Sequence, residues 1–242
     1  MDRGMVALGV SILAAWIAGS QPARGEEARY SKQTCVYKTV GDCKIQADVY
    51  RLPGEEVRPA ILWIHGGALI MGRREFVPRD QLERYLNAGF ALVSIDYRLA
   101  PETKVKGIIE DLRDAHAWLR AEGPRLFQID PDRVAVIGHS AGGYLTLMTG
   151  FCAKPRPKAL VAFYGYGDIA GAWYSRPDPF YCKQPAVPKE EAYAAVGGPS
   201  ISELTGPNKR GRFYLYCRQN GLWPKEVAGF DPDTEPRAFD PY

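Results

Sequence analysis

Val134-Ala135-Val136-Ile137-Gly138-His139-Ser140-Ala141-Gly142-Gly143 is the most informative segment of this 242-residue chain. Its apolar, β-branched start predicts a buried strand, and the apolar run from Tyr144 to Met148 predicts the helix that follows. Between them lies the pattern G-x-S-x-G, which is typical of a sharp turn that presents a serine at the end of a strand. Ser140 is therefore a candidate nucleophile. A glycine-bearing loop with an idle serine is the alternative that this motif alone leaves open.

Further strands are predicted on both sides of this segment. Upstream, the continuous apolar run 60–64 ends in His65-Gly66-Gly67, and a second run covers 90–95. Downstream, the run 159–164 is followed by Asp168. Continuous apolar runs are typical of strands that are covered on both faces. Active sites of parallel sheets lie at the carboxyl ends of the strands, and these polar residues come at those ends.

Two helices are predicted between the strands, over 80–87 and 106–121. The second has its apolar residues on one stripe and is expected to end at Gly123-Pro124. Strands that alternate with helices predict an α/β fold with a doubly wound, mostly parallel sheet. Alternating apolar and polar residues over 33–40 and 43–51 predict an antiparallel pair of strands at its N-terminal edge.

The composition is that of a globular protein with one sizeable core, because 46% of the residues are hydrophobic and 24% are charged. Basic and acidic residues are interspersed, and the formal net charge is only +3. This charge pattern gives no reason to expect nucleic acid as a partner. The sequence shows no cluster of histidines, cysteines and carboxylates, so neither a metal nor another cofactor is predicted.

The first 25 residues read as a secretory signal peptide. Arg3 is followed by an apolar run from Met5 to about Ala18, and Ala23-Arg24-Gly25 provides a small-x-small cleavage site. The run is short for a membrane span, which needs about 20 residues. We therefore expect a secreted or periplasmic protein that does not remain in the membrane, with a mature domain over 26–242. An uncleaved N-terminal anchor is the alternative.

Five cysteines in an exported chain favour disulfides, and their odd number leaves at least one unpaired within the chain. Cys43 is expected to face Val40 across a hairpin, and Cys35 is therefore not its partner. The pair Cys182–Cys217 is the preferred pairing, with the others left open.

After Asp168 the sequence becomes rich in proline and aromatic residues. We interpret 171–227 as an insertion over the carboxyl edge of the sheet that acts as a lid or a substrate wall. The alternative is that its aromatic side chains pack a small core of their own.

Three motifs, taken in order, resemble those of the α/β-hydrolase superfamily. They are His65-Gly66-Gly67, the run Asp-Tyr-Arg-Leu-Ala-Pro-Glu over 96–102, and 130–133 leading into the Ser140 motif. The chain looks most similar to the hormone-sensitive-lipase-like and the feruloyl or acetyl-xylan-type esterase branches. The resemblance covers roughly residues 30 to 170. It implies the α/β-hydrolase fold and hydrolysis of carboxylic esters through an acyl-enzyme.

The resemblance also implies roles for the residues around Ser140. The backbone N–H groups of Gly66, Gly67 and Ala141 would stabilise the oxyanion, and His65 would hold the loop that carries the two glycines. Ala68 stands where the lipase-like branch usually has a third glycine.

A serine hydrolase of this fold also needs an acid and a histidine base, in the order Ser, Asp or Glu, His. The three histidines, His65, His116 and His139, all precede Ser140. His139 is expected to point to the opposite face from its neighbour, and His116 to have a surface or packing role. Asp168 is a candidate for the acid. The sequence thus predicts a C-terminally truncated hydrolase that lacks its last strands, is nearly inert and exposes a sheet edge.

The expected activity is hydrolysis of small or carbohydrate-linked esters, with Ser140 as nucleophile. Two alternatives remain: a serine peptidase similar to prolyl oligopeptidase, and a binding protein that kept the fold and lost catalysis. The sequence does not predict an oligomeric state.

Overall fold

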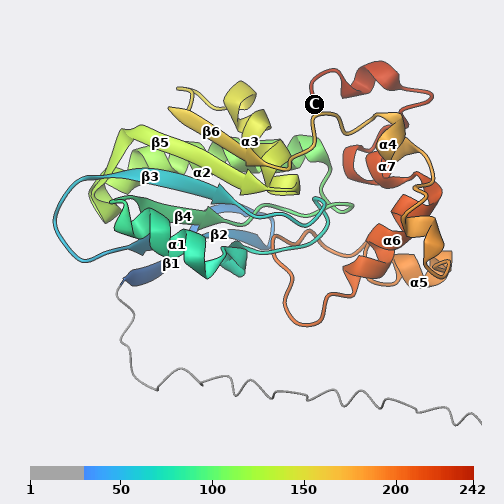
Figure 1. The fold of residues 1–242 in the computed structure, drawn as a ribbon, viewed down its shortest axis with the longest axis horizontal. Helices are drawn as coiled ribbons and strands as arrows, with labels where there is room; N and C mark the ends of the chain where they lie inside the picture. Colours follow the sequence, from blue (N-terminus) through green and yellow to red (C-terminus); the bar gives the residue numbers. More distant parts are fainter. Residues whose placement is uncertain (1–29) are drawn as a thin grey trace, which may run out of the picture.

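A six-stranded sheet with helices on both faces forms the body of the molecule (Figure 1). The computed structural model describes residues 30–242. The predicted signal peptide, 1–25, therefore lies outside the described residues. Within the described range, no helix combines the length and the apolar character that crossing a membrane would require. The strands are β1 (Ser31–Val40), β2 (Cys43–Arg51), β3 (Arg58–Ile64), β4 (Ala91–Ile95), β5 (Ile129–His139) and β6 (Ala159–Phe163).

The strand order is β1-β2-β4-β3-β5-β6. β1 pairs antiparallel with β2, and β2 pairs antiparallel with β4. The remaining pairs, β4 with β3, β3 with β5 and β5 with β6, are parallel. The sheet confirms the predicted α/β fold, mostly parallel with an antiparallel N-terminal edge. It places β5, which ends at His139, between β3 and β6.

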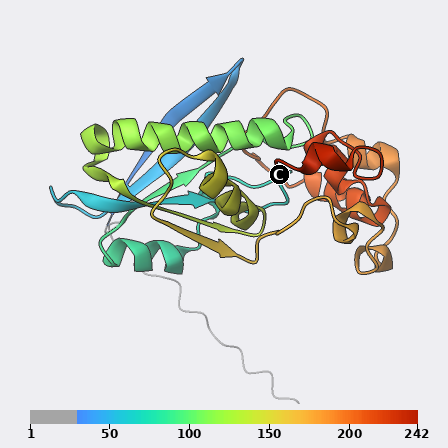
Figure 2. The same ribbon diagram turned by 90° about the horizontal axis from the view of Figure 1, so that it is seen from above.

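The helices cover the two faces of the sheet (Figure 2). On β3, Leu62 and Ile64 belong to the large core beneath α2 and α3, whereas Ile61 and Trp63 belong to a smaller core that contains residues of α1. Alternate residues of one strand thus pack on opposite faces of the sheet, as expected for the predicted doubly wound sheet. The helices are α1 (Arg79–Asn87), α2 (Val105–Phe127), α3 (Ala141–Cys152), α4 (Ala172–Ser175), α5 (Lys189–Tyr193), α6 (Arg210–Asn220) and α7 (Trp223–Ala228), with short 3-10 turns η1 (Arg74–Phe76), η2 (Tyr181–Lys183) and η3 (Pro236–Phe239).

Helix α2 continues beyond the predicted end at Gly123-Pro124. A proline removes one backbone donor, but the last turn of the helix packs closely on the start of β5. A Cβ atom on Gly123 would lie 3.3 Å from the Cβ of Ile129. The helix ends where Gln128 takes a left-handed conformation, with a φ of 47°. Packing against β5 therefore outweighs the local stop signal. Residues 130–133 lie within β5, where its pairing with β3 shifts register between Ile129 and Val134.

The chain after β6 forms short helices that lie beyond the carboxyl ends of the strands, at one end of the sheet (Figure 1). Arg210, on α6, ties this region to the body: its guanidinium donates to the carbonyls of Ile70 and Ala100 and pairs with Glu102. Both side chains of this ion pair are only 4% exposed. The interpretation of 171–227 as a lid-like insertion stays a prediction.

Strand β6 forms one edge of the described sheet. Its side chains Leu160 and Val161 are each 38% exposed, although they are apolar. These apolar side chains are partly open to solvent, and the truncation from which an uncovered edge was predicted stays a prediction.

The disulfide prediction is wrong. All five cysteines fall within 30–242, and each is free. Cys217 is buried in the core, and the thiol of Cys182 contacts the carbonyl of Gln219. The register does place Val40 opposite Cys43, as expected.

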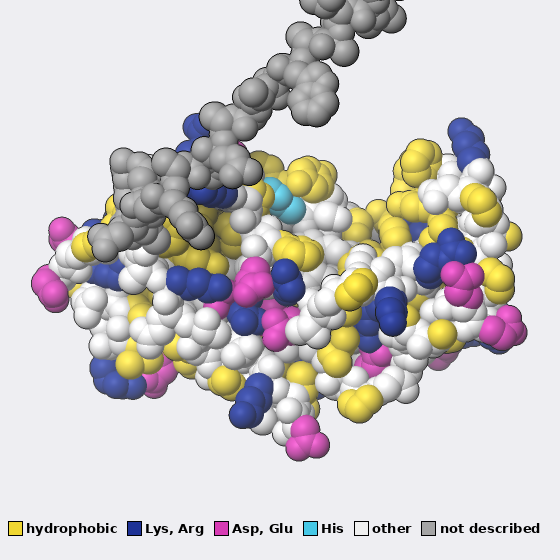
Figure 3. Space-filling model, turned by 90° about the horizontal axis from the view of Figure 1, so that it is seen from below, with side chains coloured by type: hydrophobic (Ala, Val, Ile, Leu, Met, Phe, Trp, Pro, Cys, Tyr) yellow, Lys and Arg dark blue, Asp and Glu magenta, His cyan; other side chains and the backbone are white. Residues whose placement is uncertain are grey.

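On the face shown in Figure 3, basic and acidic side chains alternate with hydrophobic ones, and neither sign of charge dominates that face.

Candidate active site

Ser140 lies at the junction between β5 and α3 in a strained conformation. Its φ is 55° and its ψ is −119°, which residues with a side chain rarely adopt. The turn is possible because Gly138 and Gly142, two residues to either side, lack side chains: a Cβ on Gly142 would lie 2.1 Å from the carbonyl oxygen of Ile64. The Ser140 N–H donates to the Phe163 carbonyl at 2.9 Å, which anchors the turn to β6. The sharp turn predicted from G-x-S-x-G is therefore present.

The glycine loop after β3 packs directly against this turn. A Cβ on Gly66 would lie 3.3 Å from the Cβ of Ser140 and 2.9 Å from the carbonyl oxygen of His139. Gly67 has a φ of +116°, and its carbonyl accepts hydrogen bonds from the N–H groups of Ile70 and Met71. The structure thus brings Gly66 against Ser140, which directly precedes Ala141, the first residue of α3. The first backbone N–H groups of a helix have no partner within that helix, so those at the start of α3 are available to another acceptor.

His65 is buried and hydrogen-bonded to the glycine loop. Its side chain is 1% exposed, and its Nδ1 donates to the carbonyl of Gly66 at 2.7 Å. The imidazole stacks on the ring of Tyr97, with 4.3 Å between centroids. Burial lowers the pKa of His65 to about 4, so the ring is neutral at neutral pH. This placement fits the supporting role that was predicted for His65.

The other two histidines face away from Ser140. The ring of His139 packs against Trp63, Phe163 and Tyr164, and its Nδ1 lies 3.1 Å from the hydroxyl of Tyr164. The expectation that His139 points to the opposite face is confirmed.

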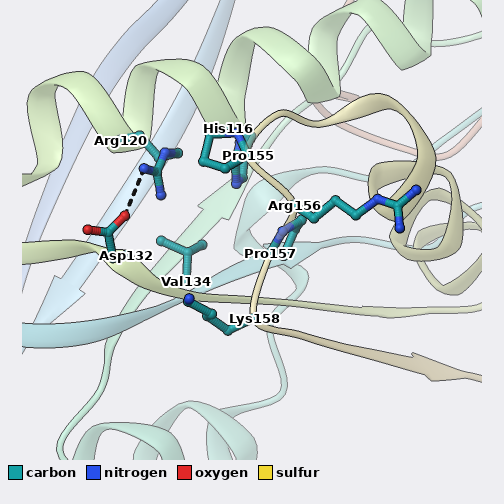
Figure 4. Close-up of a pocket in the computed structure, with 8 residues that line it drawn as sticks. All are labelled: His116, Arg120, Asp132, Val134, Pro155, Arg156, Pro157 and Lys158. Carbon is teal, nitrogen blue, oxygen red and sulfur yellow. Dashed lines mark hydrogen bonds and ion pairs between the residues drawn. The ribbon is translucent and has the colours of Figure 1, made fainter.

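His116 lines a small pocket between α2 and the loop before β6, with Arg120, Asp132 and Lys158 nearby (Figure 4). It is 1% exposed, which excludes the surface role and leaves the packing role. None of the three histidines of the sequence contacts the Ser140 hydroxyl.

Asp168 does not reach the nucleophile either. Its carboxylate accepts hydrogen bonds from the N–H groups of Ala170 and Gly171, at 2.7 and 3.0 Å. These bonds stabilise the turn before α4. The structure therefore places the candidate acid in its own turn, without a contact to Ser140 or to a histidine.

Asp96, at the carboxyl end of β4, is buried in an ion-pair cluster. Arg74 contacts Asp96, Asp48 and Glu203. Burial raises the pKa of Asp96 to about 7, although the positive charge of Arg74 opposes the rise. The cluster joins the loop after β3 to β2 and β4, so its role is structural.

The sequence did not predict a role for Tyr166, whose side chain contacts the Ser140 hydroxyl. The hydroxyl of Tyr166 lies 3.5 Å from Ser140 Oγ. Burial raises the pKa of Tyr166 to about 12. Its ring contacts Tyr174 and Trp223, with centroids 5.2 and 5.3 Å away. The sequence feature that could have indicated Tyr166 is its position just beyond the predicted strand 159–164, two residues before Asp168.

Trp223 connects the C-terminal region to the glycine loop. Its indole is 1% exposed, and Nε1 donates to the carbonyl of Ala68 at 3.0 Å. The aromatic residues of 171–227 differ in burial, and Phe213 and Trp223 belong to the large core of the sheet rather than to a small core of their own. Trp223 and Phe213 are buried, whereas Trp173 and Phe180 are 76% and 66% exposed.

A cavity of about 310 Å³ lies beside the glycine loop. Its lining combines apolar side chains with two polar ones, and consists of Gly66, Gly67, Met71, Gly72, Arg73, Phe76, Leu204, Gly206 and Asn208. Among residues 30–242, no three metal-ligating side chains come together.

Solved structures with a similar fold include two bacterial proteins. A protein of unknown function from Staphylococcus aureus gives a TM-score of 0.68 at 21% identity, covering 87% of this chain and 72% of that one. An alpha/beta hydrolase superfamily protein from Enterococcus faecalis gives a TM-score of 0.64 at 24% identity, covering 88% and 73%. These likenesses show the α/β-hydrolase fold.

Curated relatives include a non-reducing polyketide synthase from Aspergillus calidoustus. It is 37% identical over 172 residues, which are 65% of this chain and 7% of the synthase. The chain spans less than a tenth of the length of the curated relatives it matches.

The match to a family model covers the region that carries the site. The model of the BD-FAE family matches residues 47–170, just over half of the chain, from β2 to the turn beyond Asp168. The motifs around Ser140 and the fold agree with that match. The chain therefore belongs to the BD-FAE family, an esterase family of the α/β-hydrolase superfamily.

Proposed function

We propose that this chain is a serine carboxylic-ester hydrolase that forms an acyl-enzyme on Ser140. The observation that carries the proposal is the contact between the strained Ser140 turn and Gly66 of the glycine loop. This contact supports a nucleophile that lies beside backbone donors at the carboxyl ends of the parallel strands. Such a pairing is what acyl transfer requires.

In the proposed reaction, Ser140 Oγ attacks the acyl carbon, and negative charge develops on the carbonyl oxygen. The N–H groups of Gly66, Gly67 and Ala141 would donate to that oxygen. The start of α3 adds the positive end of a helix dipole. Losing one such donor typically lowers turnover by about 10²–10³-fold.

The proposed substrates are small or carbohydrate-linked esters. The cavity of about 310 Å³ beside the glycine loop suits a small acyl or alcohol group. A wider groove runs along the exposed Trp173 and Phe180, which would suit a larger alcohol portion such as a sugar.

We expect turnover to be slow, because the three histidines are held elsewhere. Removing the nucleophile or the histidine from a Ser-His-Asp triad costs on the order of 10⁶-fold in turnover. The oxyanion donors and substrate binding alone still give about 10³–10⁴-fold over water.

The proposal is tested by labelling folded protein with a fluorophosphonate probe and measuring the intact mass, with Ser140→Ala as control. Initial release of nitrophenol from 4-nitrophenyl acetate is compared with release of nitroaniline from a dipeptide anilide. An adduct that disappears in Ser140→Ala, together with a burst from the ester only, supports the proposal. Anilide cleavage would indicate a peptidase. Folded protein that neither labels nor cleaves the ester would indicate a non-catalytic binding protein.

A further inference from the structure

Tyr166 and the glycine loop follow the two strands that flank β5, the strand that leads to Ser140. The sheet order places β5 between β3 and β6. The glycine loop follows β3, and Tyr166 comes three residues after the end of β6. The Tyr166 hydroxyl lies 3.5 Å from Ser140 Oγ, within reach of a group that reacts with the nucleophile.

The position of the Tyr166 ring is fixed by its neighbours. Tyr174 and Trp223 meet it edge to face, and Trp223 is itself hydrogen-bonded to the carbonyl of Ala68. The phenol is thus held between the region after β6 and the glycine loop. A hydroxyl held in this way is pre-positioned relative to both Ser140 and the proposed oxyanion site.

We propose that Tyr166 is a catalytic residue that relays the Ser140 proton to the leaving alcohol, an inference that rests on the proposed esterase function. As the bond between Oγ and the acyl carbon forms, the Ser140 proton moves to Tyr166 Oη. Tyr166 gives its own proton to the ester oxygen as the bond between that oxygen and the acyl carbon breaks. The products are acyl-Ser140 and a neutral alcohol, and the phenol ends as it began.

The relay does not require Tyr166 to carry a negative charge, which burial of its side chain disfavours. Burial raises the pKa of Tyr166 to about 12, so a phenolate is rare at neutral pH. A base that merely removed the Ser140 proton would have to be a phenolate beforehand. Exchange of two protons through a neutral phenol meets no such requirement, and it needs no histidine.

The test is Tyr166→Phe, which keeps the ring and removes the hydroxyl. Single-turnover release of the phenol is measured for 4-methoxyphenyl, phenyl and 4-nitrophenyl acetate, with the rate of Ser140→Ala subtracted. A positioned proton donor is worth about 10²–10⁴-fold when the leaving group needs the proton. We expect a loss of about 10²-fold for the 4-methoxyphenyl ester and less than about 10-fold for the 4-nitrophenyl ester.

Tyr144→Phe is the matched control. Tyr144 lies on α3, its ring is 6.2 Å from that of Tyr166, and its buried hydroxyl has no hydrogen-bond partner within 30–242. This variant is expected to acylate at the wild-type rate with all three esters. A solvent isotope effect on wild-type acylation by the 4-methoxyphenyl ester gives a measurement that does not depend on any variant folding.

The outcomes separate the two proposals. If wild type acylates Ser140 and Tyr166→Phe loses the same factor with every ester, or loses nothing, the relay is wrong and the esterase proposal stands. A missing isotope effect on the 4-methoxyphenyl ester also contradicts the relay. If wild type does not acylate at all, the esterase proposal fails, and the relay fails with it.

Discussion

Unfavourable backbone conformations gather at the residues around the proposed oxyanion site. Ser140, Ala68 and Leu69 all have positive φ values, of 55°, 56° and 64°. The left-handed region costs a residue with a side chain roughly 1–2 kcal/mol. Such strain persists only where the surroundings hold it. Here the hydrogen bond from Trp223 to Ala68 and the contact of Gly66 with the Ser140 turn supply the restraint.

Gly67→Ala tests whether this loop geometry matters. A Cβ at position 67 would lie 1.9 Å from the carbonyl oxygen of Met71, and the φ of +116° also excludes a side chain. The loop must shift, so we expect acylation by 4-nitrophenyl acetate to slow by about 10²–10³-fold. Ala68→Gly is the control, because glycine tolerates the φ of 56° at that position, and its rate should stay within a few-fold of wild type. A folded Gly67→Ala protein with the wild-type rate would contradict the proposed oxyanion role.

The residues of the site differ in how far the sequence could predict them. Ser140, Gly66 and Gly67 belong to short motifs, since a sharp turn and a close backbone approach both require glycine at fixed spacing. Tyr166 has no such motif. Its contact with Ser140 arises because β6 lies next to β5, and the pairing of two strands is a property of the sheet rather than of local sequence.

At the scale of the elements, α2 shows where periodicity succeeds and where local signals fail. Its apolar stripe predicted both the helix and the face that packs on the sheet, because burial of one stripe stabilises a helix. Its end was misplaced, since Gly123-Pro124 reads as a stop only when the contact with β5 is unknown. The region after β6 was harder still, because its helices are short and rest on contacts with distant residues.

Helix α2 also carries a predicted pH dependence through His116. Burial, with a smaller contribution from the charge of Arg120, lowers the pKa of His116 to about 4. The unfolded chain, with a histidine pKa near 6.5, therefore binds more protons than the folded protein between about pH 4 and 6.5. The free energy of unfolding should rise with pH across this window. At pH 5, protonation of His116 in the unfolded chain but not in the folded protein should lower the free energy of unfolding by about 2 kcal/mol.

His116→Leu is expected to remove this contribution. Urea denaturation gives the free energy of unfolding of both proteins. Between pH 8 and pH 5, the value for the variant should rise by about 2 kcal/mol relative to that for wild type. The substitution does not change the charged groups that line the pocket, which are Arg120, Asp132, Arg156 and Lys158. His65 contributes the same pH dependence in both proteins. Parallel pH curves for the two proteins would show that His116 is not held neutral.

For the whole molecule, the body and the C-terminal region are joined at the site itself. Arg210 pairs with Glu102 and donates to the loop carbonyls of Ile70 and Ala100, while Trp223 donates to Ala68. These contacts join residues more than 100 positions apart. Alternation of strands and helices predicted the parallel sheet, but no local pattern could predict such long-range contacts. The proposed catalytic residues and the wall around them consequently depend on one another for position.

The exposed edge of the sheet is expected to govern how the whole molecule behaves at high concentration. An apolar edge strand offers unpaired backbone groups to another chain, and a lysine on such a strand opposes pairing. Val161→Lys on β6 should therefore raise the concentration at which light scattering detects self-association by several-fold. Val57→Lys is the control, because Val57 is 63% exposed in the segment before β3 and the substitution adds the same charge. If both variants shift the onset equally, net charge rather than the β6 edge controls association.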